Sequence, residues 1–171
     1  MRNPYYKTDE WCIIEEGFNP EMHPKSESIF SIGNGRMGQR ANFEETYSGE
    51  SLQGNYLAGV YYPDKTRVGW WKNGYPEYFA KVLNAPNWVG IQIFVENEEL
   101  DLNTCKTRYF VRILNMKDGF LERRFVATLP SGREIEVHTT RFLSLACEEA
   151  GIIKYSIKPL NFQGSISLYK L

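Results

Sequence analysis

The feature that most constrains the fold is an alternation of apolar and polar residues in the second half of the chain. Within residues 122–129, apolar side chains occupy positions 125, 127 and 129, and the alternation resumes over 135–139. The sequence Pro130-Ser131-Gly132 separates the two segments and is typical of a tight turn. Together these features predict a β-hairpin whose apolar face carries Phe125, Ala127 and Leu129.

Similar strand signals, each closed by turn residues, occupy most of the remaining chain. A sustained helical pattern is absent, and only residues 143–149 suggest a single helical turn. Many short strands at regular spacing predict an all-β fold, an antiparallel β-sandwich forming one domain over residues 1–171. The predicted strands, besides those of the hairpin, are 109–116, 91–95, 99–102, 153–157, 164–171 and a short one at 77–83.

Composition and charge exclude several classes of protein. The 171 residues are 42% hydrophobic and 24% charged, which is the balance of a globular domain. The formal net charge is −1, and the densest basic cluster, Arg123 and Arg124, is read as a solvated strand face, so we expect no nucleic-acid partner. No apolar stretch is long enough to cross a bilayer, so we expect no membrane partner.

Cysteine usage and the N-terminus favour a cytoplasmic location. Cys12, Cys105 and Cys147 are odd in number and widely spaced, which indicates free buried thiols in a reducing compartment. The first residues lack the apolar core of a signal peptide.

Residues 33–38 (GNGRMG) match the glycine pattern of dinucleotide-binding loops. Such a loop must open a helix whose N-terminus faces the pyrophosphate. The continuation here, residues 39–49, is polar and has no helical stripe. We therefore predict a tight turn between two strands, with glycines supplying positive φ angles.

The same glycine segment, SIFSIGNGRMGQR at 28–40, resembles the opening signature of the family 65 glycoside phosphorylases. The resemblance covers most of the chain from about Trp11 onward. Family members often carry an aromatic residue where this chain has Arg36, so the resemblance leaves open which disaccharide is the substrate. Further matching pieces are FEE at 43–45, LQGNYLAGVY at 52–61, VGWWKNGYP at 68–76, VLNAPNW at 82–88, LNMKDG at 114–119, LER at 121–123 and RFLSL at 141–145.

The resemblance implies a large N-terminal β-sandwich followed by a helical linker and a catalytic (α/α)₆ barrel. The reaction it implies is phosphorolysis of an α-linked disaccharide with inversion, giving β-glucose 1-phosphate and a free sugar. Inorganic phosphate is then the co-substrate, and no cofactor is expected. The catalytic glutamate belongs to the barrel, so the resemblance assigns this chain a scaffold role and predicts that it is inactive alone. The longer protein to which this chain would belong is called the parent below. Whether the parent phosphorolyses or hydrolyses its disaccharide stays open.

The chain's own acids and histidines do not suggest a catalytic site. Inverting hydrolysis needs two carboxyl groups about 6.5–9.5 Å apart. Adjacent acids, such as Glu44-Glu45, point to opposite faces of a strand and are expected to be solvated. His23 and His138 are expected to have structural roles, and no metal site is predicted.

An aromatic loop is the best candidate for contact with a ligand or partner. Three roles stay open for it: capping the sandwich core, docking against the catalytic barrel, or stacking on a sugar as a free-standing carbohydrate-binding module. The candidate docking or sugar-contacting residues are Trp70, Trp71, Asn73, Tyr75 and Trp88, together with Asn34 and Arg36 of the glycine segment.

The end of the sequence predicts an incomplete sandwich. Residues 164–171 have the pattern of a strand without a closing turn. We therefore expect a piece of a longer protein, an unpaired edge strand and self-association, with a homodimer as one partner arrangement.

Overall fold

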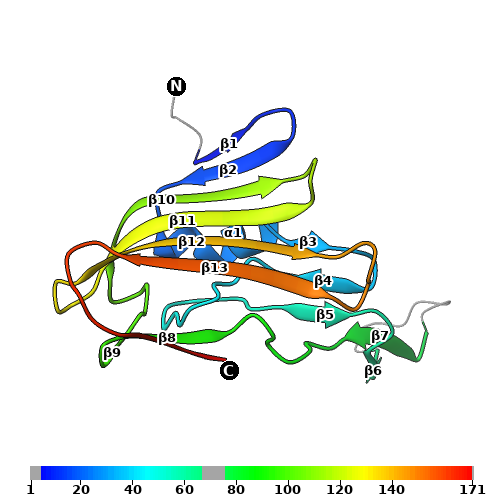
Figure 1. The fold of residues 1–171 in the computed structure, drawn as a ribbon. Coiled ribbons are helices and arrows are strands. Elements are labelled where there is room, and N and C mark those ends of the chain that lie inside the picture. The colour runs from blue at the N-terminus through cyan, green and yellow to red at the C-terminus, as the bar shows by residue number, and fades with distance from the viewer. Residues whose placement is uncertain (1–4, 67–75, 171) are drawn as a thin grey trace.

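The computed structural model describes residues 5–66 and 76–170, and every structural statement below concerns these residues. Its largest element is a six-stranded antiparallel sheet (Figure 1). In spatial order, the strands are β1 (Tyr6–Thr8), β2 (Cys12–Glu16), β10 (Lys106–Asn115), β11 (Phe120–Thr128), β12 (Glu134–Leu143) and β13 (Gly151–Pro159).

Smaller sheets make up the rest of the fold. A three-stranded sheet has the order β14 (Ile166–Lys170), β8 (Ile91–Val95) and β9 (Glu98–Glu99), and another has the order β3 (Ile32–Gly33), β4 (Met37–Gln39) and β5 (Asn55–Leu57). The hairpin of β6 (Tyr61–Lys65) and β7 (Tyr78–Val82) forms a separate two-stranded sheet at one end of the molecule (Figure 1).

The main hydrophobic core lies between the large sheet and the β14–β8–β9 sheet. It joins Phe110, Phe125 and Ile135 of the large sheet to Ile93 and Val95 of β8. Phe125, Ala127 and Leu129 are all buried, as the alternation predicts. The all-β antiparallel sandwich is therefore confirmed.

One helical segment is missing from the sequence-based prediction. A 3₁₀ turn (η1, Pro20–Met22) runs into the seven-residue helix α1 (His23–Ile29). Two turns are too short to display a helical period, and Pro24 reads as a loop residue although proline is tolerated in a first turn. The single helical turn predicted at 143–149 was wrong, since that segment contains bends and turns.

The glycine segment forms a strand–turn–strand unit, as predicted. Strands β3 and β4 pair through Gly33 and Gly38, and Gly35 has a φ of 88° in the turn between them. That backbone conformation is open to glycine and costly for most other residues. No helix opens at Gly38, so the geometry of a dinucleotide-binding loop is missing here.

Several other predictions can be checked against the strands and thiols. The strand at 77–83 is present as β7, and the one at 164–171 as β14, which pairs only with β8 and so lies at a sheet edge. The strand expected at 99–102 is instead the two-residue β9. All three cysteines are free, but the predicted burial was wrong, since Cys12 and Cys105 are half-buried and Cys147 is exposed. Within the described ranges, no helix has the length and apolar character needed to span a bilayer.

Candidate functional site

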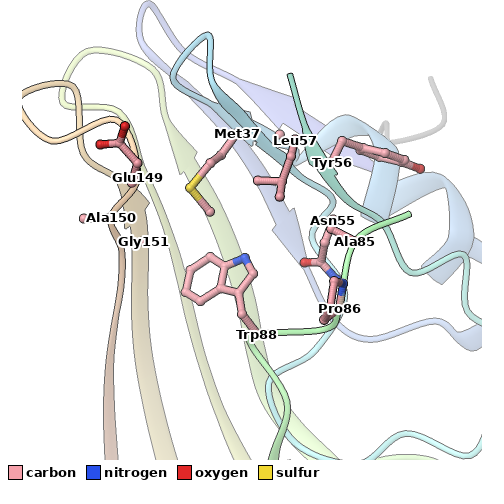
Figure 2. A pocket seen from close by; sticks show the side chains of 11 residues that line it. Met37, Asn55, Tyr56, Leu57, Ala85, Pro86, Trp88, Glu149, Ala150 and Gly151 are labelled. Carbon is pink, nitrogen blue, oxygen red and sulfur yellow. The ribbon is translucent and has the colours of Figure 1, made fainter. Parts of the chain in front are cut away.

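A pocket of about 420 Å³ opens beside the edge strand β13 (Figure 2). One wall comes from β4 and β5, another from the segment that precedes β8, and the third from the start of β13. We call it the Trp88 pocket. Its lining residues are Met37, Gly38, Asn55, Tyr56, Leu57, Ala85, Pro86, Trp88, Glu149, Ala150 and Gly151.

The indole of Trp88 packs directly against the first residue of β13. A Cβ atom added at Gly151 would lie 2.4 Å from the Trp88 ring, so a side chain at this position would displace the indole. Trp88 also lines a second hollow of about 410 Å³, together with Ile153, Leu168 and Tyr169. The half-buried ring thus contributes to two adjoining hollows along the β13 edge.

The most buried polar side chain among the lining residues of the Trp88 pocket is the carboxamide of Asn55. Its residue is 3% exposed, and its Oδ1 accepts no hydrogen bond. The backbone of Asn55 is held on both sides, since its N–H donates to Asn84 Oδ1 and its C=O accepts from the N–H of Ala85, each at 2.7 Å. Figure 2 shows the Asn55 oxygen directed toward the Trp88 ring.

The predicted site residues are only partly covered by the structure. Trp70, Trp71, Asn73 and Tyr75 lie outside the described residues, so contacts through them stay predictions. Trp88 is present and lines the pocket, whereas Asn55 was missed because nothing in the sequence singles out one asparagine.

Asn34 and Arg36 lie in the turn between β3 and β4. The side chain of Asn34 donates to the carbonyls of Ser144 and Glu148 and accepts from the N–H groups of Arg36 and Met37. It therefore ties the glycine turn to the loop that leads into β13. Arg36 is exposed, and its contact with a sugar or partner stays a prediction.

A second candidate surface is the β6–β7 hairpin, whose two faces differ in chemistry. In the antiparallel register, Tyr61 lies opposite Val82 on one face, and Tyr61 and Val82 are 51% and 49% exposed. The other face carries Tyr62, Phe79 and an ion pair between Lys81 and Asp64 at 3.4 Å. We call the first face, which carries Tyr61, Pro63, Tyr78, Ala80 and Val82 with Lys65 opposite Tyr78, the apolar hairpin face.

A row of polar side chains crosses the buried face of the large sheet. The strand register places Glu15, Arg112, Arg123, Thr139 and Tyr155 in successive positions on β2, β10, β11, β12 and β13. The first four are at most 3% exposed. We call this set the polar row. Because buried charges are costly unless paired, each of them needs partners from the segments that cover the sheet.

The partners of Arg123 come from the irregular segment after β4. Its guanidinium binds the carboxylates of both Glu44 and Glu45. Arg141 Nη1 lies 3.4 Å from Glu44 Oε1, and the hydroxyl of Tyr155 donates to Glu45 Oε2 at 3.0 Å. The ring of Phe43 packs on the guanidinium of Arg123, 4.3 Å from ring centroid to Cζ. Residues 43–45 are thus anchored to three strands of the large sheet.

Arg112 has a corresponding set of partners from β2 and α1. Arg112 Nε lies 3.2 Å from Glu15 Oε2, and Nη2 lies 3.3 Å from His23 Nδ1. The other ring nitrogen of His23 lies 3.3 Å from Glu27 Oε1. Glu27 also accepts from Ser51 Oγ at 2.5 Å, which connects α1 to the segment before β5.

These contacts correct two sequence-based interpretations. Arg124 is exposed, but Arg123 is buried. The interpretation of both arginines as a solvated strand face is therefore right for Arg124 and wrong for Arg123. Glu44 and Glu45 are also buried, and they converge because they lie outside any strand. One signal was available in the sequence. Arg123 is two and four positions before Phe125 and Ala127, which face the core, so its side chain must lie on the same buried face of the strand.

Burial and ion pairing shift the pKa values of this network in opposite directions. Burial alone would raise the pKa of Glu44, but Arg141 and Arg123 hold it below its ordinary value. The pKa of Glu27 is also lowered, because hydrogen bonds from His23, Ser51 and the Leu52 N–H outweigh burial. Burial lowers the pKa of His23, against the opposing effect of Glu27.

We expect the chain to lose stability on acidification, beginning with His23. Its folded-state pKa lies below the ordinary 6.5, so the unfolded chain binds a proton first as the pH falls below about 6.5. The contribution of neutral His23 to the free energy of unfolding is therefore complete above that pH, and it is lost as the pH falls toward the folded-state pKa of His23. Glu27 and Glu44 add further losses below their ordinary 4.5.

Thermal unfolding at pH 7.5 and pH 5.5 checks this expectation, with His23→Gln as the control. The melting temperature of the unchanged chain should be lower at pH 5.5, and the variant should show a smaller difference. An equal pH response in both proteins would contradict the assignment to His23.

Comparisons with known proteins agree with this architecture. The chain matches the family described as glycosyl hydrolase family 65, N-terminal domain, over residues 13–170. It is 48% identical over 163 residues to a maltose phosphorylase of Bacillus subtilis (strain 168), covering 95% of this chain and 21% of that protein. It is 32% identical over 166 residues to a kojibiose phosphorylase of Thermoanaerobacter brockii, covering 97% and 20%.

A solved structure also matches the fold. It is assigned as a kojibiose phosphorylase from the human microbiome and superimposes with a TM-score of 0.79 at 34% identity, covering 91% of this chain and 20% of that one. The chain therefore spans about a fifth of the length of the phosphorylases it matches. On the family match and these relatives, the chain belongs to glycosyl hydrolase family 65, within its N-terminal domain.

Proposed function

We propose that this chain is the non-catalytic N-terminal domain of an inverting α-glucoside phosphorylase and acts as a scaffold packed on the parent's catalytic barrel. The parent would convert an α-linked disaccharide and inorganic phosphate to β-glucose 1-phosphate and a free sugar, in the cytoplasm and without a cofactor. One observation carries this proposal: the chain aligns with phosphorylases over nearly all of its own length but only a fifth of theirs.

The carboxylates of the described residues support a non-catalytic role. An inverting mechanism needs two carboxyl groups about 6.5–9.5 Å apart with the substrate between them. The Trp88 pocket has one carboxylate in its lining, that of Glu149. Glu44 and Glu45 are adjacent but buried against Arg123, where no substrate reaches them.

The apolar hairpin face is the surface we propose for docking. A two-stranded hairpin has too small a core to be stable by itself, so a partner that covers one face would stabilise it. Tyrosines and aliphatic side chains exposed together are typical of interface anchors. The face has Tyr61, Tyr78 and Val82 about half exposed and one charged residue, Lys65, whereas the opposite face combines Tyr62 and Phe79 with the Lys81–Asp64 pair that water solvates well.

Two neighbouring tyrosines provide a matched test of docking. Tyr61 and Tyr62 are 51% and 55% exposed but lie on opposite faces. The binding partner in this experiment is the Bacillus subtilis maltose phosphorylase without the 21% of its length that matches this chain. We expect Tyr61→Ser to weaken binding to that remainder by about tenfold or more, since an interface anchor is worth at least about 1.4 kcal/mol.

Binding is measured by surface plasmon resonance with the unchanged chain as reference. Tyr62→Ser should bind nearly as well as that reference. Equal losses in the two variants, or no loss with Tyr61→Ser, would contradict docking through this face.

A further inference from the structure

Strand β13 has a long free edge that no described strand covers. It is the last strand of the large sheet and pairs with β12 alone, over nine residues (Figure 1). The other outermost strands in the described ranges, β14 among them, have two to five residues, and short edge strands resist pairing with other chains. A nine-residue edge with unpaired N–H and C=O groups is, in contrast, a template for one more strand.

The side chains of β13 also lack cover on the face that points into the sandwich. Ile153, Tyr155 and Ile157 are half-buried, whereas the residues opposite them on β12 are at most 2% exposed. Burial therefore decreases at the last strand of the sheet. The hollow of about 410 Å³ that Ile153 lines with Leu168 and Tyr169 lies at the same place. A strand added beyond β13 would remove this apolar surface from water.

Two lysines on the outward face of β13 restrict the register of such a strand. Lys154 and Lys158 are exposed there, together with Ile152 and Ser156. If a second copy pairs antiparallel about a two-fold axis at Tyr155, all nine residues of β13 are paired. Lys154 then lies opposite Ser156 of the second copy. Lys158 lies opposite Ile152, which its alkyl stem covers.

The neighbouring registers are unfavourable because they bring like charges together. An axis at Lys154 would place that lysine opposite its own copy. An axis at Ser156 would place Lys154 opposite Lys158 of the second copy. Like charges directly opposite each other on paired strands are destabilising. The charge pattern of β13 therefore favours self-pairing about Tyr155 over the adjacent alternatives.

We propose that β13 is a self-association edge, through which two copies of this chain pair antiparallel about a two-fold axis at Tyr155. The two large sheets then form one continuous sheet, and Ile157 of each copy lies opposite Ile153 of the other, next to its hollow. The apolar hairpin face shares no residue with β13, so the inference does not rest on the proposed docking to the catalytic barrel.

Sedimentation equilibrium of the 171-residue chain over a series of concentrations measures the dissociation constant of the dimer. The average mass should approach twice that of one chain as the concentration rises. Ser156→Lys should raise the dissociation constant by about tenfold, because the symmetry creates two contacts between residue 156 and Lys154. Ser156→Glu is the matched counterpart and should lower the dissociation constant, since each new carboxylate lies opposite a lysine. Position 156 is exposed, and circular dichroism checks that both variants are folded.

A pair of cysteines tests the register directly. Ile152→Cys and Lys158→Cys are combined in a chain whose exposed Cys147 is replaced by serine. Residues directly opposite each other on antiparallel strands lie within disulfide distance, so mild oxidation should give a covalent dimer. Each substitution alone is the control and should give none.

Several results would overturn the proposal. The unchanged chain could stay monomeric at every concentration, or the two Ser156 variants could shift the dissociation constant in the same direction or leave it unchanged. A dimer that the paired cysteines do not cross-link would contradict the register. The edge would belong to a different occupant if the chain is monomeric and Ser156→Lys instead weakens its binding to the Bacillus subtilis maltose phosphorylase without the matching 21%. Failure of docking through Tyr61 would leave all of these measurements unaffected.

Discussion

Replacing Arg123 by methionine should lower the free energy of unfolding by about 3–5 kcal/mol, the usual cost of removing one partner from a buried ion pair. The variant leaves Glu44 and Glu45 without the guanidinium that pairs with both of them. Arg141 still reaches Glu44, at 3.4 Å, but Glu45 retains only the hydroxyl of Tyr155. Urea denaturation followed by circular dichroism measures the loss.

The adjacent residue supplies the control for this prediction. Arg124 occupies the next position on β11, and its side chain is 63% exposed. Arg124→Met should change the free energy of unfolding by no more than about 0.5 kcal/mol, as most surface substitutions do. Similar losses in both variants would mean that the polar row does not hold the covering segment to the sheet.

The second large effect is expected for Phe43→Ala, at about 3–5 kcal/mol. Phe43 is 5% exposed and packs against the guanidinium groups of Arg112 and Arg123. Its ring centroid also lies 4.2 Å from that of His23 and 5.6 Å from that of Phe18. Truncation therefore opens a cavity where the core meets the polar row.

Phe142→Ala is the comparison for Phe43, since Phe142 lies on the other face of the large sheet and is 38% exposed. Its truncation should cost clearly less in the same denaturation experiment. A smaller loss for Phe43→Ala than for Phe142→Ala would show that residues 43–45 do not support the core.

Long strands were predictable because their side chains must alternate between two environments. The hairpin of β11 and β12 and the edge strand β13 follow directly from that alternation. The helix α1 was not predictable in this way, because seven residues show no period. Glu44 and Glu45 were also misread, since no local pattern reveals that an irregular segment folds back onto three arginines.

The candidate site was less predictable than the fold, for a related reason. Trp88 stands out in the sequence as a large aromatic residue, but its pocket depends on three segments meeting in space. Asn55 and Gly151 are ordinary residues until the structure places them around the indole.

The FEE piece of the family resemblance now has a physical explanation. Phe43 fills the core, while Glu44 and Glu45 neutralise arginines of β11 and β12. These carboxylates hold a covering segment in place and are shielded from any substrate. Residues 43–45 therefore have a structural role in this domain.

The most direct test of this account is a phosphorolysis assay of the purified chain, alone and co-expressed with the remainder of the Bacillus subtilis maltose phosphorylase that lacks the matching 21%. Maltose and inorganic phosphate are supplied, and release of glucose 1-phosphate is measured. The account predicts no product from the chain alone or from the remainder alone, and product when the two are expressed together. Glucose 1-phosphate formed by the chain alone would contradict it.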